Sequence, residues 1–424
     1  MFRKELALII MLCGTLCAPS VQAQEIIVCT KTWVGGEKGI WENAANWSPY
    51  GEPNEANSVC ISDASVDVSE NHEVGSLTTN GEVELERGVW WHPTITTLNG
   101  LTNHGDLAIR IDIRGDVTNI AGATLEFGEH INIFGDLYNE VGGTITVDMA
   151  DIDVEEGGEV YNDGLIRCIA NGGIGETPYF HNNGEIQLFV GGGANGNIFD
   201  NNIAAVIRGS GGVNGQELHN KGTICASTGP LLLYFEGSLT NSGTLKNDVG
   251  ATLHITKVAD VNNQGTIEIN ASGAVTTDGN VINQPNSIIK LLGGTLAAGK
   301  ITQKADANFT GFGGITGNVQ IDPDGLIELT GPTNIIGDVN IPAGATLKIS
   351  DGQTLITGHT TCDGTIHLIG GTVIFQGGCD CDGCNIINEA GTDRNHFDIN
   401  ADGIEDFKDF AEFANNWLWQ ASWY

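Results

Sequence analysis

The chain contains 424 residues, of which 60 are Gly, 53 are Asp or Glu and only 18 are Lys or Arg, so its formal net charge at pH 7 is −35. Because phosphate backbones and anionic membranes are bound by clusters of Lys and Arg, this balance argues against nucleic acid, membrane surfaces and acidic polysaccharides as main partners. Only 17% of residues are charged and 40% are hydrophobic, which excludes a disordered acidic tail and leaves either several domains or one long solenoid.

Residues 1–23 have the pattern of a secretory signal peptide. Arg3 and Lys4 form a charged start, residues 6–16 form an apolar stretch, and Val21-Gln22-Ala23 is a small-residue cleavage site. The apolar stretch is shorter than the roughly 20 residues that a membrane span needs, and no later stretch approaches that length. We therefore expect a secreted protein, extracellular or at the cell surface, without a membrane span.

Residues 24–74 concentrate tryptophan, with Trp33, Trp41 and Trp47 close together. An open solenoid end exposes a sheet edge and part of the core, so we expect these rings to form an N-terminal cap. The alternative is that Trp47, or the pair Trp90 and Trp91, stacks on a sugar ring. The segment resembles one that is common at the start of exported repeat proteins of planctomycetes and related bacteria, where it precedes a β-solenoid.

Eight cysteines remain after the signal segment, and an even number in an exported chain favours disulfides. Cys29 and Cys60 flank one compact segment and form a plausible pair. The cluster of Cys379, Cys381 and Cys384, with Cys362 nearby, offers two more bridges that would close the end of the repeats; a zinc or iron–sulfur site is the alternative. Cys168 and Cys225 lie in strand-like runs, either as buried free thiols or as a pair.

The middle of the chain, residues 75–378, repeats a short motif about every 20 residues. The unit is an apolar residue, a spacer, Asn, one or two residues, Gly and then an alternating apolar strand. Weaker copies follow at Asp324-Gly325, Ala343-Gly344 and Asp363-Gly364. The clearest copies are centred on Asn103, Asn119, Asn139, Asn162, Asn182, Asn220, Asn241, Asn263 and Asn283, with a degenerate copy near Asn202 in the longest gap.

This period, combined with alternating apolar residues, predicts an all-β, right-handed parallel β-helix of roughly 15 coils. Inward aliphatic residues would stack on the same residues of the next coil, Gly would occupy turns, and each Asn amide would hydrogen-bond the Asn of the next coil. At about 4.8 Å per coil, the rod would be on the order of 70 Å long. An array of β-sandwiches is the rival fold, but sandwiches lack a constant repeat of this length.

Residues 379–394 form a Cys-rich cap or linker, and residues 395–424 carry the sharpest motif of the chain. Oxygen ligands fall at loop positions 1, 3, 5, 7, 9 and 12, with Gly403 at the sixth position, where the bend is tightest. Ca²⁺ prefers six to eight oxygen ligands, so we expect this small C-terminal module to bind Ca²⁺. The expected ligands are the side chains of Asp398, Asn400, Asp402, Asp406 and Asp409 and the carbonyl of Ile404.

A helix is predicted to follow the loop, because apolar residues recur at three- and four-residue spacing. They are Phe407, Phe410, Ala411, Ala414, Trp417 and Leu418. A loop followed by a helix, with Asp at position 12 and no entering helix, resembles half of a type I dockerin and the loop-plus-helix tails of exported planctomycete proteins. The resemblance implies docking to an extracellular partner such as a cohesin, although cellulosomal dockerins have two paired loops and this chain has one. The apolar side of the helix would cover either the solenoid end or another protein.

A polysaccharide-degrading enzyme is the alternative function, because β-helix proteins include glycoside hydrolases and lyases. The Lys and Arg residues that a lyase of uronates needs are scattered without a cluster, and the ten His are dispersed, mainly at turns such as His104, His181 and His219. Asp151 and Asp153 are the weak catalytic candidates, because on a strand they would share one face, roughly 7 Å apart. A solvated acidic face is the other interpretation of these carboxylates.

The sequence thus predicts a secreted, non-catalytic structural or adhesive β-solenoid with a calcium-binding, dockerin-like tail for attachment or assembly. The alternatives are a polysaccharide-degrading hydrolase or lyase that carries the same tail, and a carbohydrate-binding module without chemistry.

Overall fold

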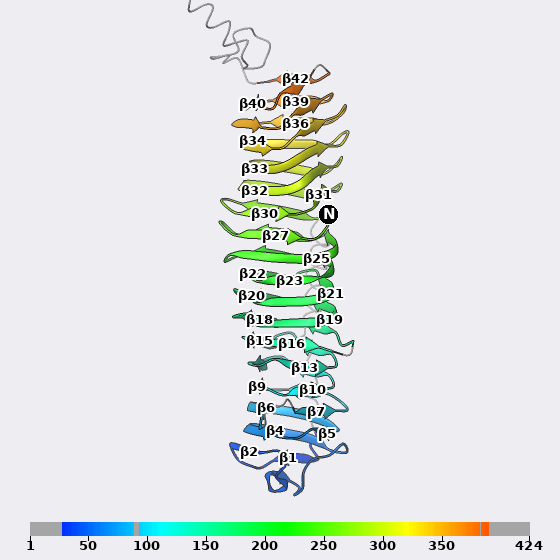
Figure 1. The fold of residues 1–424 in the computed structure, drawn as a ribbon, viewed down its shortest axis with the longest axis vertical. Coiled ribbons are helices and arrows are strands. Elements are labelled where there is room, and N and C mark those ends of the chain that lie inside the picture. Colours follow the sequence, from blue (N-terminus) through cyan, green and yellow to red (C-terminus); the bar gives the residue numbers. More distant parts are fainter. Residues whose placement is uncertain (1–27, 89–92, 156, 382, 390–424) are drawn as a thin grey trace, which may run out of the picture.

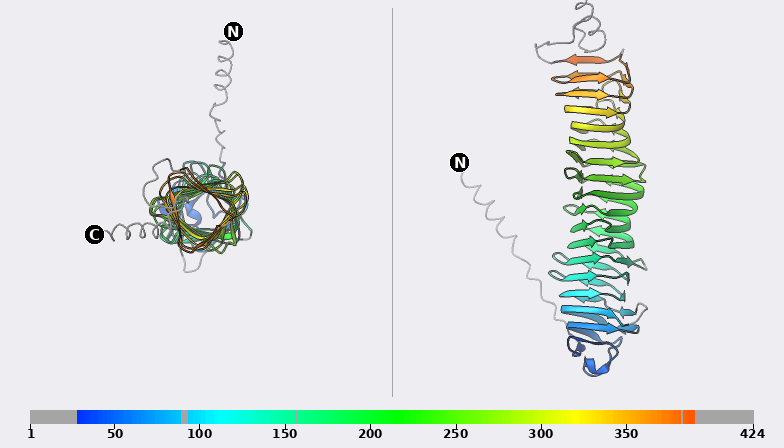
Figure 2. Two further views of the ribbon diagram at one scale, coloured as in Figure 1. Left: turned by 90° about the horizontal axis from the view of Figure 1, so that it is seen from above. Right: turned by 60° about the vertical axis from the view of Figure 1, so that its left-hand side comes forward.

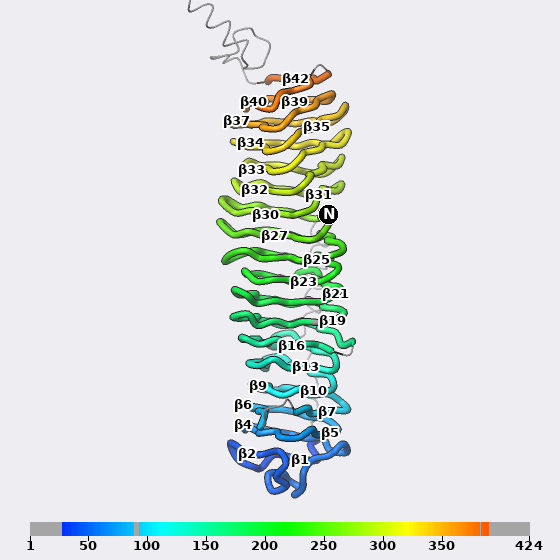
Figure 3. Tube along the Cα trace, viewed as in Figure 1, coloured from blue at the N-terminus to red at the C-terminus, as the bar shows by residue number. Residues whose placement is uncertain are grey.

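The structure is a computed structural model that describes residues 28–88, 93–155, 157–381 and 383–389. These residues form one rod of stacked coils, which runs from the blue N-terminal end to the orange C-terminal end (Figure 1). There are about 16 turns of about 20 residues each, so the predicted parallel β-solenoid is confirmed. Successive coils superimpose when the rod is seen along its axis (Figure 2), and the chain trace shows each coil as one loop of a continuous path (Figure 3).

The regular elements of the described residues are 42 strands and one short 3₁₀ turn, η1 (Ala44–Asn46). The first strands are β1 (Lys31–Trp33), β2 (Lys38–Ile40), β3 (Trp47–Ser48), β4 (Ser58–Val68), β5 (His72–Val74), β6 (Ser76–Arg87), β7 (Thr94–Thr97), β8 (Leu101–Asn103), β9 (Asp106–Ile109), β10 (Asp112–Arg114), β11 (Val117–Asn119), β12 (Thr124–Phe127), β13 (Ile131–Phe134) and β14 (Leu137–Asn139). The middle strands are β15 (Thr144–Asp148), β16 (Asp151–Val154), β17 (Val160–Asn162), β18 (Leu165–Ile169), β19 (Gly173–Asn182), β20 (Glu185–Leu188), β21 (Gly193–Asn201), β22 (Val206–Gly209), β23 (Gly212–Asn220), β24 (Thr223–Ala226), β25 (Pro230–Asn241), β26 (Thr244–Asn247), β27 (Thr252–Thr256) and β28 (Asp260–Asn263). The last are β29 (Thr266–Asn270), β30 (Ala274–Thr277), β31 (Asn280–Asn283), β32 (Ile288–Gln303), β33 (Asn308–Ile321), β34 (Leu326–Ile336), β35 (Val339–Ile341), β36 (Thr346–Ile349), β37 (Gln353–Ile356), β38 (Thr360–Cys362), β39 (Thr365–Leu368), β40 (Thr372–Phe375), β41 (Cys379–Asp380) and β42 (Asn385–Asn388).

Each strand of the stack pairs in parallel with the strands one coil before and one coil after it. β11, for example, lies between β8 and β14, so Asn119 is aligned with Asn103 on one side and Asn139 on the other. The parallel pairs reach back to β1 and β4, while β1 pairs with β3 in the antiparallel sense. Equivalent residues of successive repeats therefore lie in straight rows along the rod.

The core of the rod consists of the inward side chains of these rows. Along β12, the buried residues Leu125 and Phe127 alternate with Thr124 and Glu126, which face outward. Because side chains alternate across a strand, every second residue of each coil enters the interior. A single coil cannot cover its own apolar side, so the core exists only where coils stack.

One inward row is polar and fully buried. Its amide groups form a ladder in which each Nδ2 donates to the side-chain oxygen of the next coil at 2.7–2.9 Å. The same Nδ2 also donates to a backbone carbonyl of the next coil, as Asn119 does to Thr144. The row consists of Asn103, Asn119, Asn139, Asn162, Asn182, Asn201, Asn220, Asn241, Asn263, Asn283 and Gln303, and the Thr79 hydroxyl donates to its first member.

The ladder corrects the position expected for the degenerate repeat. The amide that fills the gap between Asn182 and Asn220 belongs to Asn201, whereas Asn202 lies one residue further on and bonds the Asn183 side chain near the surface. Because neighbouring residues point to opposite sides of a strand, a shift of one residue exchanges a buried position for an outward one.

Three tryptophans fill the N-terminal end of the core. Trp41 and Trp47 are 0% and 2% exposed, and their ring centroids lie 4.8 Å apart in an edge-to-face arrangement. Trp33 packs against Trp47 in the same manner at 5.0 Å. The Cys29–Cys60 disulfide, which the sequence suggested, joins the chain before β1 to β4. Buried aromatic surface and a covalent link thus close this end of the rod.

Candidate functional site

Asp151 and Asp153, the weak catalytic candidates, lie in β16 beside two glycines of the next coil. Asp151 is aligned with Gly173 and Asp153 with Gly175. An Oδ1 atom of each carboxylate lies about 3 Å from the place where a Cβ of its glycine would be, at 3.2 and 3.1 Å. Both carboxylates therefore lean in the same direction over space that glycine leaves free.

Asp151 and Gly173 line a shallow hollow on one face of the rod, whereas Asp153 and Gly175 are not among its lining residues. Gly173, Gly193 and Gly212 follow Asp151 in one outward row, and Leu232 is the next residue of this row. The hollow has a volume of about 370 Å³, and Asn195 and Asn214 line its side. Its floor is strand backbone, because three successive coils place no side chain there.

The chemistry that this hollow offers is limited. A glycosidase places two carboxyl groups on opposite sides of the bond that it cleaves. Asp151 and Asp153 instead lie on one strand, and of the two only Asp151 lines the hollow. The Asp153 carboxylate lies 3.5 Å from Nε2 of His130. The arrangement provides acidic hydrogen-bond acceptors but no opposed acid and base.

A second outward row, absent from the sequence reasoning as a group, contains stacked aromatic rings. Tyr138, Tyr161 and His181 stack with ring centroids 4.9 Å apart at each step. Since the faces of the rings contact one another, the rings present mainly their edges to solvent, and a sugar has no free face of Tyr161 on which to stack. The row continues with Asp200 and His219, whose Oδ1 and Nδ1 atoms lie 2.8 Å apart.

The tyrosines of this row are held by carboxylates. The Tyr138 hydroxyl donates to Asp136 at 2.7 Å, and the Tyr161 hydroxyl donates to Glu159. The hydrogen bond to Glu159, together with burial, raises the pKa of Tyr161 to about 12, and the bond to Asp136 raises the pKa of Tyr138 as well. Both phenols therefore stay protonated at neutral pH and act as hydrogen-bond donors.

The sequence interpretation of His181 and His219 as turn residues was wrong. His181 lies in β19 and His219 in β23, each directly before an Asn of the buried ladder. Tyr138 and Tyr161 occupy the same position of their repeats. An alignment of the repeats on their Asn residues would have placed these four side chains in one row.

Cations also line up along the rod, although the sequence scatters them. One outward row contains five cations, and at least one neutral or acidic residue, such as Glu268, lies between each cation and the next. The cations are Arg167, Arg208, Lys246, Lys290 and Lys348. Lys348 contacts Glu328 at 2.9 Å, and a hydrogen bond from Ser350 together with Lys348 lowers the pKa of Glu328. Because like charges in adjacent coils would repel, the alternation gives a stable surface and not a cationic patch.

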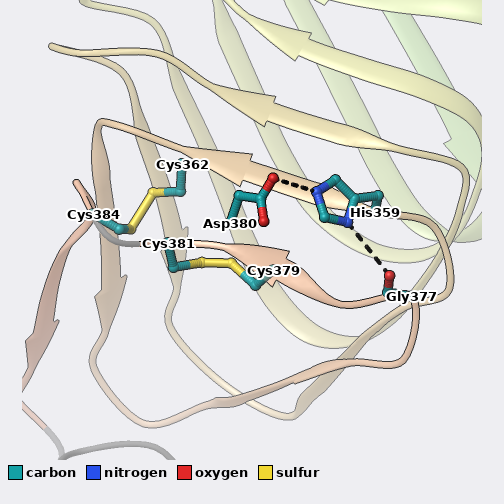
Figure 4. Close-up of a disulfide and its surroundings, with 7 residues drawn as sticks. All are labelled: His359, Cys362, Gly377, Cys379, Asp380, Cys381 and Cys384. Carbon is teal, nitrogen blue, oxygen red and sulfur yellow. Dashed lines mark hydrogen bonds and ion pairs between the residues drawn. A yellow bond between two sulfur atoms is a disulfide. The ribbon is translucent and has the colours of Figure 1, made fainter.

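The Cys-rich C-terminal end contains two disulfides, Cys362–Cys384 and Cys379–Cys381 (Figure 4). His359 lies nearby, with Nε2 3.1 Å from Asp380 and with Nδ1 directed at the Gly377 carbonyl. The hydrogen bond to Asp380 raises the pKa of His359. Zinc and iron–sulfur sites need thiolate ligands, and sulfur atoms in disulfides are not thiolates. In this disulfide-bonded state, the four cysteines therefore do not form the zinc or iron–sulfur site that the sequence offered as an alternative.

Cys168 and Cys225 are free and buried, which decides the alternative that the sequence left open. Burial raises the pKa of Cys168 to about 12 and that of Cys225 to about 11. Both therefore remain neutral thiols near pH 7, without the thiolate character of a catalytic cysteine. Within the described ranges, no group of three or more His, Cys, Asp or Glu side chains is arranged to hold a metal ion.

The predicted calcium ligands Asp398, Asn400, Asp402, Ile404, Asp406 and Asp409 lie outside the described residues. The same holds for the predicted helix and for Trp90 and Trp91.

The geometry of the described residues defines the class of the protein as a parallel β-solenoid stabilised by disulfides. No family model matches the chain, and neither a curated protein nor a solved structure matches it. In the part of the chain that the structure describes, no helix is long and apolar enough to cross a membrane.

Proposed function

We propose that the protein is a secreted, non-catalytic structural or adhesive rod, located outside the cell or at its surface, whose C-terminal residues 395–424 bind Ca²⁺ and serve attachment or assembly. The observation that carries the proposal is the continuous stack of about 16 similar coils. Such a stack presents long rows of repeated polar chemistry on a rigid support. The disulfides and the signal-like residues 1–23 support export, because disulfides persist in oxidising compartments.

The outward rows support a surface role over a catalytic one. The rings of the aromatic row stack on one another, the cations of the cationic row alternate with neutral and acidic residues, and the hollow is lined by a single carboxylate, that of Asp151. An extracellular protein, of cohesin type or otherwise, is the proposed partner of the tail. Polysaccharide is a second partner class, which the hydrogen-bonding groups of the hollow would contact.

Calcium binding is tested by calorimetry on the mature full-length chain. The wild type should bind one Ca²⁺, and Asp398→Ala should lose this site because it removes the first loop ligand. Asp393→Ala, which lies just before the loop, is the matched control and should bind as the wild type does. Equal binding heats for the wild type and Asp398→Ala would contradict the proposed calcium site.

A polysaccharide-degrading enzyme is the second candidate, and the hollow beside Asp151 and Asp153 is the observation that favours it. We expect no release of reducing ends or unsaturated products from a panel of neutral and acidic polysaccharides. Should an activity appear, the double variant Asp151→Asn/Asp153→Asn decides whether it belongs to this hollow, with exposed Asp278→Asn as the control. Activity that falls only in the double variant would replace the structural role by an enzymatic one.

A further inference from the structure

The C-terminal end of the rod is an open coil. Strand β40 pairs with β37, β41 with β38, and β42 with β39, all in the preceding coil. Within the described residues, no strand pairs with the other edge of these three strands. Figure 1 shows β40 and β42 at the orange end of the rod. The outer side of these strands is therefore a sheet edge of the kind that proteins cover.

The core is also uncovered at this end. Val373 and Phe375 are only partly buried, although they pack on the core and lie directly over Thr354 and Ile356, which are 0% exposed. Ile386 is half-buried over the fully buried Ile366. In the preceding coil the residues of the same rows are fully buried. Val373, Phe375 and Ile386 are therefore partly exposed because no further coil of the described chain stacks on them. An apolar surface of this kind requires a cover.

The opposite end shows how this chain closes a core. There the cover is a segment outside the regular coils, and it consists of aromatic side chains that become 0–7% exposed: Trp33, Trp41 and Trp47. The chain beyond β42 has the same resource. It comprises 36 residues, 389–424, and carries Phe407, Phe410, Trp417 and Leu418 on one predicted helical side.

We propose that residues 407–418 form an amphipathic helix that lies across the open C-terminal coil and covers Val373, Phe375 and Ile386 with its apolar side. A helix of 12 residues is about 18 Å long, which exceeds the roughly 13 Å of a four-residue strand such as β39. The 18 residues between β42 and Phe407 are long enough to reach back over the end at about 3.3 Å per residue.

The occupant is the chain's own tail because the tail is tethered to the surface that it covers. A short connection gives a tethered segment an effective concentration in the millimolar range, which exceeds that of a second copy or of another secreted protein. This inference goes beyond the proposed function, since it assigns the apolar side of the helix to the rod and leaves the loop and the polar side for attachment. Only its calcium dependence rests on the proposed function: the loop, residues 398–409, overlaps the start of the helix, so a bound ion would fix that start.

The test is amide hydrogen exchange on the mature full-length chain, read at β40 and β42. Trp417→Asp places a charge on the apolar side and should make these edge amides exchange about tenfold faster. Asn416→Asp, the matched control, adds the same charge on the opposite side and should leave exchange unchanged. The amides of β26, in the middle of the rod, report in every variant whether the solenoid itself is folded.

A second variant changes the surface of the rod instead of the tail. Phe375→Ser should release the tail, so that the amides of residues 407–418 exchange about tenfold faster while β26 stays protected. Equal exchange of β40 and β42 in the wild type, Trp417→Asp and Asn416→Asp would overturn the proposal. Protection that appears only at high protein concentration, with a dimer in sedimentation, would assign the cover to a second copy and overturn it as well.

The two proposals fail in different experiments. If Asp398→Ala shows that the loop binds no Ca²⁺ while Trp417→Asp still opens the end, the calcium function fails and the cover stands. If Ca²⁺ binds but β40 and β42 do not respond to Trp417→Asp, the cover fails and the calcium function stands.

Discussion

At the scale of single residues, the Glu42 carboxylate supports the N-terminal Trp cluster through its contact with His72. Its Oε1 accepts hydrogen bonds from the backbone N–H groups of Ser69 and Glu70 at 2.7 and 3.0 Å and lies 3.1 Å from Nε2 of His72. The His72 ring in turn stacks on Trp41. Burial by itself would raise the pKa of Glu42, but these hydrogen bonds outweigh burial and hold the pKa below 4.5.

We predict that Glu42→Gln lowers the free energy of unfolding at pH 7 by about 1–2 kcal/mol, because hydrogen bonds to a charged group are lost. The folded pKa lies below the unfolded one, so the stabilisation is complete above about pH 4.5 and is lost as the pH falls through the folded pKa. Urea unfolding at pH 7 and pH 3 measures the difference, with exposed Glu70→Gln as the control. A difference of equal size at both pH values would contradict the role of the ionised carboxylate.

At the scale of elements, the buried amide ladder adds side-chain hydrogen bonds inside the core to strands that already pair through their backbones. Asn201 of β21 accepts from Asn182 of β19 and donates to Asn220 of β23. We predict that Asn201→Ala destabilises the protein by about 2–4 kcal/mol, because it leaves one buried donor and one buried acceptor without a partner. Thermal or urea unfolding measures the loss.

The adjacent Asn202 provides the control for this prediction. Its side chain also bonds an Asn of the preceding coil, but near the surface, where water can replace the lost partner. Asn202→Ala should therefore cost no more than about 1 kcal/mol. Similar losses for the two alanine variants would show that the ladder contributes no more than a surface pair does.

The comparison of these neighbours also shows how far the sequence predicts the fold. The 20-residue period, the turn Gly and the recurring Asn predict stacked coils and an amide row, because each coil must present the same residue to the next. The sequence could not place the degenerate copy, since two Asn stand side by side at 201 and 202 and the usual Gly does not follow them. The hollow at Gly173, Gly193 and Gly212 and the Tyr138–His219 row were missed for a related reason. Alternation shows which residues face outward, but only the register between coils shows which of them are neighbours.

At the scale of the whole molecule, the rod behaves as a stack in which each coil contacts only its two neighbours. Removal of residues 221–241, which contain the whole of β24 and β25, joins Asn220 to Ser242 and so deletes one coil between equivalent positions of two repeats. We predict that this variant folds and that the rod is shorter by about 4.8 Å. Small-angle scattering and circular dichroism measure length and strand content.

A deletion out of phase with the coil is the control. Removal of residues 221–231 takes away about half a coil, so inward rows would meet outward rows from that point on. This variant should lose cooperative unfolding or aggregate. If both deletions fold equally well, the stacking of equivalent rows does not determine the fold.

The amide row stops at Gln303, whose longer side chain donates to the Leu326 carbonyl at 3.0 Å, and the same position is held by Ile321, Ile341 and Cys362 in later coils. From Asn103 to Gln303 every amide of the row donates toward the C-terminal end. A coil inserted within this part of the rod would need a side chain that both donates and accepts to keep the chain of hydrogen bonds intact. A coil inserted between Gln303 and the C-terminal end could carry any aliphatic residue of suitable size at this position. The rod can therefore change length far more readily near its C-terminal end, and natural variants that differ in coil number should differ there first.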